Sequence, residues 1–311
     1  MRDTILFGDC RETLKQFDEQ ARTCITSPPY YGLRDYGGED NQIGQEQTPD
    51  DFIEQLVNVF KEVRNVLTDD GTCWVNLGDS YYNYRPGKGQ GLPKQSVSST
   101  KQDLPDVCPR RGNRISGLKE KDLIGIPWLF AFAMRADGWY LRQDIIWHKP
   151  NPMPESVRDR CTKAHEYIFL FSKNRKYFYD NEAIKEPAKD WGTRDRTKGK
   201  YHNPGTGLAP HSGLSKSYAT KNKRSVWSVT NKPYKGAHFA VFPPELIEPC
   251  IKAGSEKGDI ILDPFMGSGT TGMVAKQLGR DYIGCELNEE YGKLIQKRVT
   301  DYKVSIMDII D

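Results

Sequence analysis

The stretch ILDPFMGSGTTGMVAKQLGRDYIGCE, residues 261–286, carries the strongest structural signal in this chain of 311 residues. An apolar run ends at Asp263, a glycine-rich turn follows, and a helical pattern begins at Thr270. Glycine lets a backbone approach a ligand closely, and the N-terminus of a helix offers unpaired N–H groups to a carboxylate or phosphate. The succession of strand, glycine turn, helix and strand therefore predicts a ligand site in an α/β fold.

The ligand is further defined by Glu286, which ends the next predicted strand 17 residues after Gly269. An acidic residue at that place can accept hydrogen bonds from both hydroxyls of a ribose. The turn departs from the G-x-G-x-x-G pattern of dinucleotide sites and lacks the G-K-[ST] of a phosphate-binding loop. A nucleoside with a small charged tail is favoured, and S-adenosylmethionine combines an adenine, a ribose and an amino-acid carboxylate.

Strands and helices alternate outward from this stretch. We predict helices at 50–67, 122–135, 244–253, 270–278 and 288–299, a turn at Gly71, and strands at 22–26, 72–78, 140–149, 166–172, 258–265 and 281–286. This alternation is typical of a doubly wound, mostly parallel sheet with helices on both faces. We therefore expect a Rossmann-like α/β fold.

Two polar and basic segments interrupt the alternation. Residues 181–237 contain 12 Lys and Arg against 4 Asp and Glu, and residues 85–121 contain 9 against 3, although the whole chain has a net charge of only +3. A charge run is usually a solvated surface. Two such segments, rich in Gly, Ser and Asn and inserted in an otherwise acidic chain, favour loops that meet a polyanion.

Several other classes of protein are disfavoured by composition. No apolar run approaches the ~20 residues of a membrane helix, and the N-terminus lacks the pattern of a secretory signal, so we expect a cytoplasmic protein without a membrane partner. The seven cysteines include no C-x-x-C pair and no closely spaced Cys–His set. We therefore expect neither a metal site nor a disulfide framework.

A second motif, TSPPYYG at residues 26–32, follows the first predicted strand. Proline fixes φ, lacks an N–H group and pushes the preceding residue towards extended geometry. The segment is thus a rigid arm with free carbonyls and two aromatic rings. Taken alone, a proline turn over packed core aromatics explains it equally well, and we expect Tyr31 to belong to the core.

TSPPY and LDPFMGSGTT together resemble the motifs of amino-group DNA methyltransferases, which modify cytosine N4 or adenine N6. The catalytic motif precedes the cofactor motif and a basic variable region lies between them, which resembles the β arrangement of that family. The resemblance covers nearly the whole chain. Further resembling segments are GDC (8–10), NLGDSYY (76–82), DIIWHKPNPMPES (144–156), KAHEYIFLFSK (163–173) and AHFAVFPPELI (237–247).

The resemblance implies a division of labour along the chain. Residues 1–180 are expected to form the catalytic part of the methyltransferase core, with a basic loop at 83–119, residues 181–237 the target-recognition region, and residues 238–311 the cofactor-binding part of the same core. The implied cofactor is S-adenosyl-L-methionine and the implied partner is double-stranded DNA. A cognate restriction endonuclease is a further implied partner, and both a monomer and a homodimer remain open.

The chemistry of the reaction gives the catalytic motif its roles. An exocyclic amine is a poor nucleophile, because its lone pair is delocalised into the ring, so the enzyme must hold it in line with the methyl group and accept its N–H hydrogen bonds. Ser27 Oγ and the backbone carbonyl of Pro28 are the candidate acceptors. The target base must leave the duplex stack, and Tyr30 is the natural face on which it would stack. The candidate catalytic residues are Ser27, Pro28, Pro29 and Tyr30.

The binding residues follow from the same resemblance. For His238, an ordinary hydrogen-bonded histidine is an equally good interpretation, and most arginines in basic runs contact the DNA backbone without reading sequence. The implied cofactor residues are Asp9, Cys10, His238, Phe239, Pro243, Asp263, Pro264, Phe265, Gly267, Ser268, Gly269, Thr270, Thr271 and Glu286. The candidate DNA-binding residues are Arg110, Arg111, Arg114, Lys221, Lys223 and Arg224.

Three alternatives concern the substrate. Family members with serine at the position of Ser27 mostly modify cytosine N4, which favours cytosine, although a hydroxyl also suits the amine edge of adenine. Protein glutamine methyltransferases use a related [ND]PPY motif, but usually with the cofactor motif first. A DNA-binding module without catalysis is disfavoured because both motifs are intact.

Overall fold

The computed structural model describes residues 2–32, 42–82, 117–188, 219–231 and 242–307. Its centre is an eight-stranded sheet in the order β1-β10-β9-β2-β3-β5-β4-β8. Five of its seven strand pairings are parallel and two are antiparallel, which confirms the expected mostly parallel, doubly wound α/β fold. The strands are β1 (Thr4–Phe7), β2 (Ala21–Thr26), β3 (Leu67–Leu77), β4 (Tyr140–His148), β5 (His165–Ser172), β8 (Val226–Ser228), β9 (Ile260–Asp263) and β10 (Asp281–Glu286).

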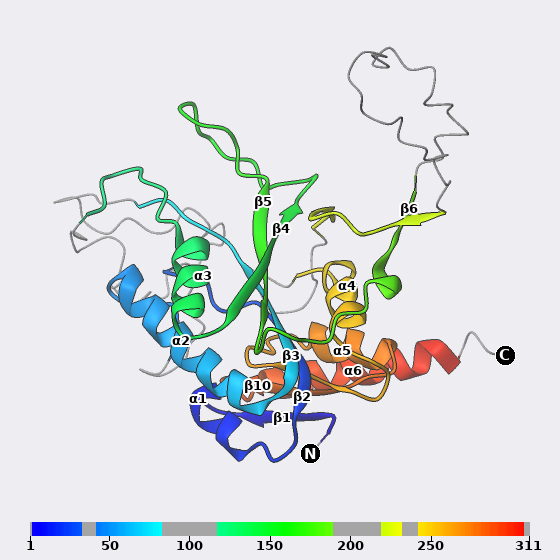
Figure 1. Ribbon diagram of the computed structural model, residues 1–311. Coiled ribbons are helices and arrows are strands. Elements are labelled where there is room, and N and C mark those ends of the chain that lie inside the picture. Colours follow the sequence, from blue (N-terminus) through cyan, green and yellow to red (C-terminus); the bar gives the residue numbers. More distant parts are fainter. Residues whose placement is uncertain (1, 33–41, 83–116, 189–218, 232–241, 308–311) are drawn as a thin grey trace, which may run out of the picture.

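Helices cover both faces of this sheet, as Figure 1 shows. On one face, α2 (Pro49–Val66) and α3 (Ile126–Ala136) enclose one buried apolar cluster. On the other, α4 (Pro244–Gly254), α5 (Thr270–Gln277) and α6 (Tyr291–Met307) enclose a second. The smaller elements are α1 (Cys10–Thr13), two 3-10 turns, η1 (Leu14–Gln16) and η2 (Glu182–Ile184), and an antiparallel pair of β6 (Glu186–Pro187) with β7 (Thr220–Lys221).

Helix α2 shows how the sequence sets these elements. Thr48 caps it by accepting a hydrogen bond from the N–H of Asp51, and Pro49 occupies the first turn, where its missing N–H costs nothing. Apolar residues at helical spacing, from Phe52 to Val63, are buried against the sheet. Among the described residues, no helix is long and apolar enough to span a bilayer.

Several element boundaries differ from the sequence prediction, and a glycine explains two of these differences. Helix α3 begins at Ile126 rather than at residue 122, because Gly125 has a φ of 84° and caps the helix, and Pro127 fits its first turn. Gly71 lies inside β3 instead of forming a turn. A Cβ at Gly71 would lie 2.9 Å from the carbonyl oxygen of Thr68 and 3.2 Å from that of Arg22, so only glycine lets β3 pass β2 there.

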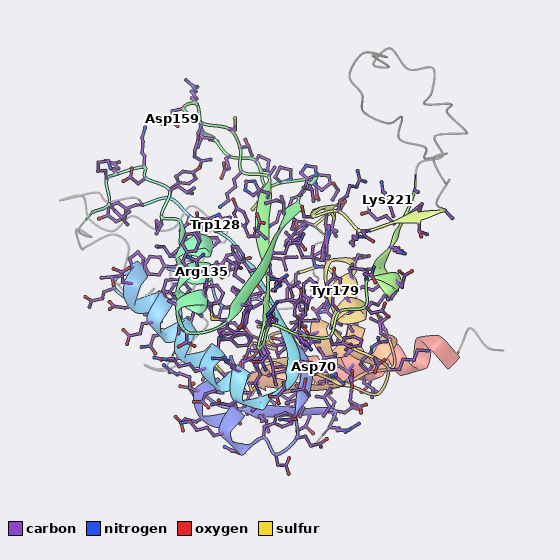
Figure 2. All side chains as sticks on the ribbon, viewed as in Figure 1. Asp70, Trp128, Arg135, Asp159, Tyr179 and Lys221 are labelled. Carbon is purple, nitrogen blue, oxygen red and sulfur yellow. The ribbon has the colours of Figure 1, made fainter. Side chains whose placement is uncertain are left out.

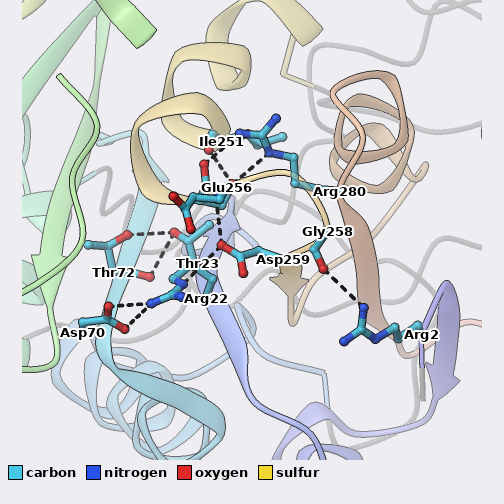
Figure 3. Close-up of polar contacts among 11 residues, drawn as sticks. Arg2, Arg22, Thr23, Asp70, Thr72, Ile251, Glu256, Gly258, Asp259 and Arg280 are labelled. Atoms are coloured by element: carbon cyan, nitrogen blue, oxygen red, sulfur yellow. Dashed lines mark hydrogen bonds and ion pairs between the residues drawn. The ribbon is translucent and has the colours of Figure 1, made fainter. Parts of the chain in front are cut away.

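Ion pairs connect neighbouring strands at the end of the sheet where β2 begins (Figure 3). The guanidinium of Arg22 on β2 bridges Asp70 on β3, at 2.5 Å, and Asp259 before β9, at 3.2 Å. These contacts fix the relative positions of three strands that are far apart in sequence. Since those strands are parallel, their opposite, carboxyl ends also gather at one edge, with Thr26, Leu77 and Asp263 at their last positions.

Candidate catalytic and cofactor site

Asp263 connects the two sequence motifs at this carboxyl edge. Its Oδ1 accepts a hydrogen bond from Thr26 Oγ1 at 2.6 Å, and its Oδ2 accepts one from Thr271 Oγ1 at 2.6 Å. The N–H of Phe265 also donates to Oδ1, at 3.0 Å. Thr26 immediately precedes Ser27, and Thr271 lies in the first turn of α5. The carboxylate therefore holds the start of the proline arm and the glycine turn together.

This carboxylate is only 1% exposed. Burial raises the pKa of Asp263 to about 6, although the hydrogen bonds from Thr26, Thr271 and Phe265 oppose that rise. The two threonine donors are also buried, so the three hydrogen bonds form a closed unit beneath the site. Asp263 thus holds the proline arm and the start of α5 in fixed positions.

The glycine turn is tightly packed. Gly269 caps α5 with a φ of 81°, and a Cβ there would lie 2.8 Å from Ile295 Cγ2 on α6. Ser268 is buried and its hydroxyl accepts a hydrogen bond from Arg298 at 2.5 Å. Pro264, Thr270 and Thr271 are buried as well, whereas Phe265 and Gly267 are half-buried. The partly exposed surface of the turn is therefore Phe265 and Gly267.

Glu286 lies beside this surface at the end of β10. Its Oε2 accepts a hydrogen bond from the N–H of Gly267 at 2.8 Å, and its Oε1 accepts one from the N–H of Asn288 at 3.0 Å. Burial raises the pKa of Glu286 to about 7, against the lowering effect of these two N–H groups. The carboxylate is half-buried and retains lone pairs for further hydroxyl donors.

The N-terminal members of the predicted cofactor set lie next to Glu286. The N–H of Gly8 donates to the Glu286 carbonyl at 2.9 Å, so the turn after β1 follows the end of β10. Asp9 caps α1 and forms an ion pair of 2.5 Å with Arg11. Burial tends to raise the pKa of Asp9, but the contacts with Arg11 outweigh it and the net shift is downward. Cys10 is buried, and its burial raises the thiol pKa.

The rest of that set lies before α4. Pro243 is buried and caps that helix. His238 and Phe239 lie outside the described residues.

The proline arm leaves β2 at the same edge. Pro28 is buried, while Ser27, Pro29 and Tyr30 are half-buried. The hydroxyl of Tyr30 donates to Glu166 Oε2 at 2.8 Å, and its ring lies against the backbone of Gly78. Tyr31 is 2% exposed and packs on Phe52 with ring centroids 5.4 Å apart, which confirms its place in the core.

Polar residues to which the sequence analysis gave no role surround Ser27 and Tyr30. Asn76 comes from the end of β3, Glu166 from the start of β5, and Lys149 from the residue after β4. Lys149 and Glu166 form an ion pair whose side chains are only 17% and 15% exposed. The sequence did contain a signal for these residues. Each is a polar side chain at or just beyond the end of an apolar strand, within a segment that resembles the family.

Lys163 lies beside the same ion pair, just before β5. Its Nζ is buried and makes no hydrogen bond within the described part of the chain. Burial lowers the pKa of Lys163, while the nearby carboxylates of Asp79 and Glu166 act in the opposite direction. The site thus contains a buried amine near the charged groups that contact the proline arm.

The candidate DNA-binding residues fall into two groups. Lys221, Lys223 and Arg224 surround the carboxylate of Glu186, with N–O distances of 3.9, 3.9 and 3.1 Å. Lys221 lies with the β6–β7 pair, across the molecule from Trp128 and Arg135 on α3 (Figure 2). One carboxylate shared by three cations leaves this cluster net positive. Arg110, Arg111 and Arg114 lie outside the described residues.

Gly78 offers a structural test of the Tyr30 position. A Cβ at Gly78 would lie 2.6 Å from Tyr30 Cε2, so Gly78→Ala should displace the ring and lower the free energy of unfolding by about 1–3 kcal/mol. Urea denaturation measures this loss. In a Tyr30→Ala background the steric conflict is absent, and the same substitution should cost much less. Equal costs in both backgrounds would show that the ring does not rest on Gly78.

Comparison with known proteins places the chain among enzymes that act on DNA. A sequence profile of a family described as DNA methylase matches residues 21–297. The type II methyltransferase M.SmaI of Serratia marcescens is 46% identical over 303 residues, which cover 95% of this chain and 90% of that protein. The type II methyltransferase M.XycI of Xanthomonas campestris pv. cyanopsidis is 45% identical over 311 residues, covering 99% of this chain and 92% of that protein.

Solved structures share the fold. The PvuII DNA methyltransferase, named as cytosine-N4-specific, superposes with a TM-score of 0.60 at 19% identity and covers 99% of this chain and 93% of its own. A DNA modification methylase of Thermus thermophilus, solved with S-adenosyl-L-methionine, gives a TM-score of 0.58 at 22% identity, with 96% of this chain and 93% of that chain covered.

Proposed function

This chain belongs to the DNA methylase family of amino-group methyltransferases, and we propose that it methylates the N4 amine of a cytosine flipped out of duplex DNA. The observation that carries the proposal is the hydrogen bond from Thr26 to Asp263. It holds Ser27, the first residue of the SPPY arm, against the glycine turn. A base amine at Ser27 and a cofactor at the turn would then be neighbours.

The described residues suit S-adenosyl-L-methionine, the cofactor of this family. We propose that the carboxylate of Glu286, half-buried at the end of β10, accepts the ribose hydroxyls, and that the turn with Phe265 and Gly267 forms the adjoining wall. Gly269 permits the close packing of that turn on α6. The bound cofactor supplies an electrophilic methyl group on a sulfonium.

The proline arm would activate the amine. Ser27 Oγ and the Pro28 carbonyl accept its N–H hydrogen bonds, which localises the nitrogen lone pair towards the methyl group. The new N–C bond forms as the S–C bond breaks, and one amine proton then leaves to solvent. Ser27 is an acceptor in this scheme, because an unperturbed hydroxyl is a poor base.

Serine at the head of the motif favours cytosine over adenine, and the fold of the cytosine-N4-specific PvuII enzyme accommodates the whole chain. The test is nucleoside mass spectrometry of genomic DNA from a host without its own DNA methylation. N4-methylcytosine supports the proposal. N6-methyladenine would change the assigned target base to adenine but leave the proposed catalytic and cofactor site unchanged. If cells contain folded protein but their DNA contains no new modified nucleoside, the proposal is wrong.

Recognition of the DNA is assigned to the basic insertions. We propose that Lys221, Lys223 and Arg224 contact phosphates, because their charges exceed that of Glu186. Since the relatives are type II methyltransferases, we propose as a partner a cognate restriction endonuclease that cuts the same DNA sequence when it is unmethylated.

Cofactor binding should depend on pH through Glu286. The ribose hydroxyls need the ionised carboxylate, whose pKa is raised to about 7, so affinity should fall as the pH falls through that value. Between pH 8 and pH 6 the dissociation constant should rise by about tenfold. Calorimetric titration of the protein with S-adenosyl-L-methionine measures it. Glu286→Gln should bind weakly and without this slope. If the affinity of that variant still fell with pH as in the wild type, Glu286 would not be the cofactor-binding carboxylate.

A further inference from the structure

Asn76 is a buried polar residue that contacts the proline arm. It lies at the end of β3 with 4% of its surface exposed. Its Oδ1 faces the hydroxyls of Ser27, at 3.4 Å, and Tyr30, at 3.3 Å. Its Nδ2 faces the carbonyl oxygen of Tyr167, at 3.1 Å, and Oε2 of Glu166, at 3.4 Å. One amide therefore connects Ser27 with strand β5.

The surroundings allow only one orientation of this amide. The carbonyl of Tyr167 can only accept a hydrogen bond, and so can the carboxylate of Glu166, which is paired with Lys149. Both acceptors must meet the NH₂ group of Asn76. Its oxygen is then left towards Ser27, and the Ser27 hydroxyl must donate its proton to that oxygen.

This direction matters for the chemistry of the base. A serine hydroxyl that was free to rotate could donate to the ring nitrogen beside the amine, which would withdraw electron density from the nucleophile. Once its proton is committed to Asn76, the Ser27 oxygen presents only lone pairs to the substrate. The contact is long, as is common for catalytic hydrogen bonds that tighten when substrate binds.

We propose that Asn76 is a positioning residue that makes Ser27 Oγ a hydrogen-bond acceptor for the amine of the flipped base. This rests on the proposed function and adds a residue to it. Backbone and carboxylate acceptors on β5 orient Asn76, and Asn76 in turn orients Ser27. Asn76 itself need not touch the base.

A double-mutant cycle on the full-length protein tests the proposal. Single-turnover methyl transfer to duplex DNA would be compared for wild type, Ser27→Ala, Asn76→Ala and the double variant. Each single substitution should slow transfer by about tenfold, the worth of one hydrogen bond to the reacting group. The double variant should be no slower than Ser27→Ala, because Asn76 acts only through the hydroxyl. The affinity for S-adenosyl-L-methionine should change by less than about twofold throughout.

Multiplicative losses, about a hundredfold in the double variant, would overturn the role of Asn76 while leaving the methyltransferase function intact. Failure of the wild type to methylate any DNA would instead overturn the function itself. These two failures are distinct, because only the first occurs with an active wild-type enzyme.

A second variant keeps the test decisive if Ser27→Ala transfers too slowly to measure. In Asn76→Asp a protonated carboxyl can still donate to Tyr167 and accept from Ser27, but an ionised one cannot donate and lies beside Glu166, which Lys149 and Lys163 face. Its transfer rate relative to wild type should therefore rise as the pH is lowered towards the pKa of the introduced carboxyl, which its buried position beside Glu166 raises. A ratio that stays constant from pH 8 to pH 5 would contradict the proposal.

Discussion

Replacing Asp263 by alanine is expected to lower the free energy of unfolding at pH 7 by about 3 kcal/mol and to abolish detectable methyl transfer. The substitution removes the acceptor of Thr26, Thr271 and the N–H of Phe265. Each buried donor left without a partner costs about 1–3 kcal/mol. Removal of a carboxylate that is itself poorly solvated offsets part of this sum. Urea denaturation and a radiolabelled methyl-transfer assay measure the two effects.

The pH dependence of that loss distinguishes the buried carboxylate from other causes. The pKa of Asp263 is raised to about 6, above its ordinary value of 3.8, so this group favours folding less as the pH rises between the two values. The difference in unfolding free energy between wild type and Asp263→Ala should thus be up to about 3 kcal/mol smaller at pH 7 than at pH 4. A difference that does not vary with pH would contradict this account of Asp263.

Asp263→Asn is the matched control. The amide oxygen still accepts from one donor, and Thr271 has a second acceptor nearby in the carbonyl of Ile25, at 3.5 Å. We expect a stability at pH 7 closer to wild type than that of the alanine variant, without the titration. If the asparagine variant also retains methyl transfer, the link between the two motifs needs hydrogen bonds and not charge.

The fold was largely predictable because its signals are local. Apolar periodicity located the main helices and central strands, and the glycine turn fixed the strand–turn–helix unit at residues 260–277. β1 and β8 were missed because they are short and mostly half-buried or exposed, whereas the equally short β9 is fully buried and forms a clear apolar run. Gly71 was predicted to form a turn because the sequence does not show that β3 packs closely beside β2 at this position. The neighbour that requires a glycine there, the backbone of Arg22, is distant in sequence.

The site was less predictable than the fold. The sequence pointed directly to Ser27 and Glu286 as candidates, but the contact of Asp263 with Thr26 and Thr271 depends on the pairing of β2 with β9. The contact of Asn76 with Tyr167 depends in the same way on the pairing of β3 with β5. Sequence periodicity shows that a strand exists but does not say which strand lies beside it, so contacts between strands became visible only in three dimensions.

Tyr30→Ala is expected to lower the rate of methyl transfer to duplex DNA by about 10- to 100-fold, because stacking of one base on an aromatic ring is worth about 1–3 kcal/mol. Binding of duplex DNA should change little, since that depends mainly on phosphate contacts elsewhere. The measurement is single-turnover transfer together with a DNA-binding titration on the same oligonucleotide.

Tyr30→Phe separates the ring from its hydroxyl. The phenyl ring keeps the stacking face and its contact with Gly78, and loses the hydrogen bond to Glu166 at 2.8 Å. We expect a loss of about tenfold or less, the worth of one hydrogen bond. A loss as large as that of the alanine variant would show that Tyr30 acts through Glu166 and not through its ring.

Base flipping supplies the decisive control for Tyr30. A mismatch opposite the target base lowers the energy needed to extrude it, so a variant that fails to hold the flipped base should recover on a mismatched duplex. Tyr30→Ala should regain much of its lost rate there, whereas Ser27→Ala, which lacks an acceptor for the amine, should not. Equal recovery of the two variants would mean that both residues serve the same step, and that the assignment of stacking to Tyr30 and of amine activation to Ser27 is wrong.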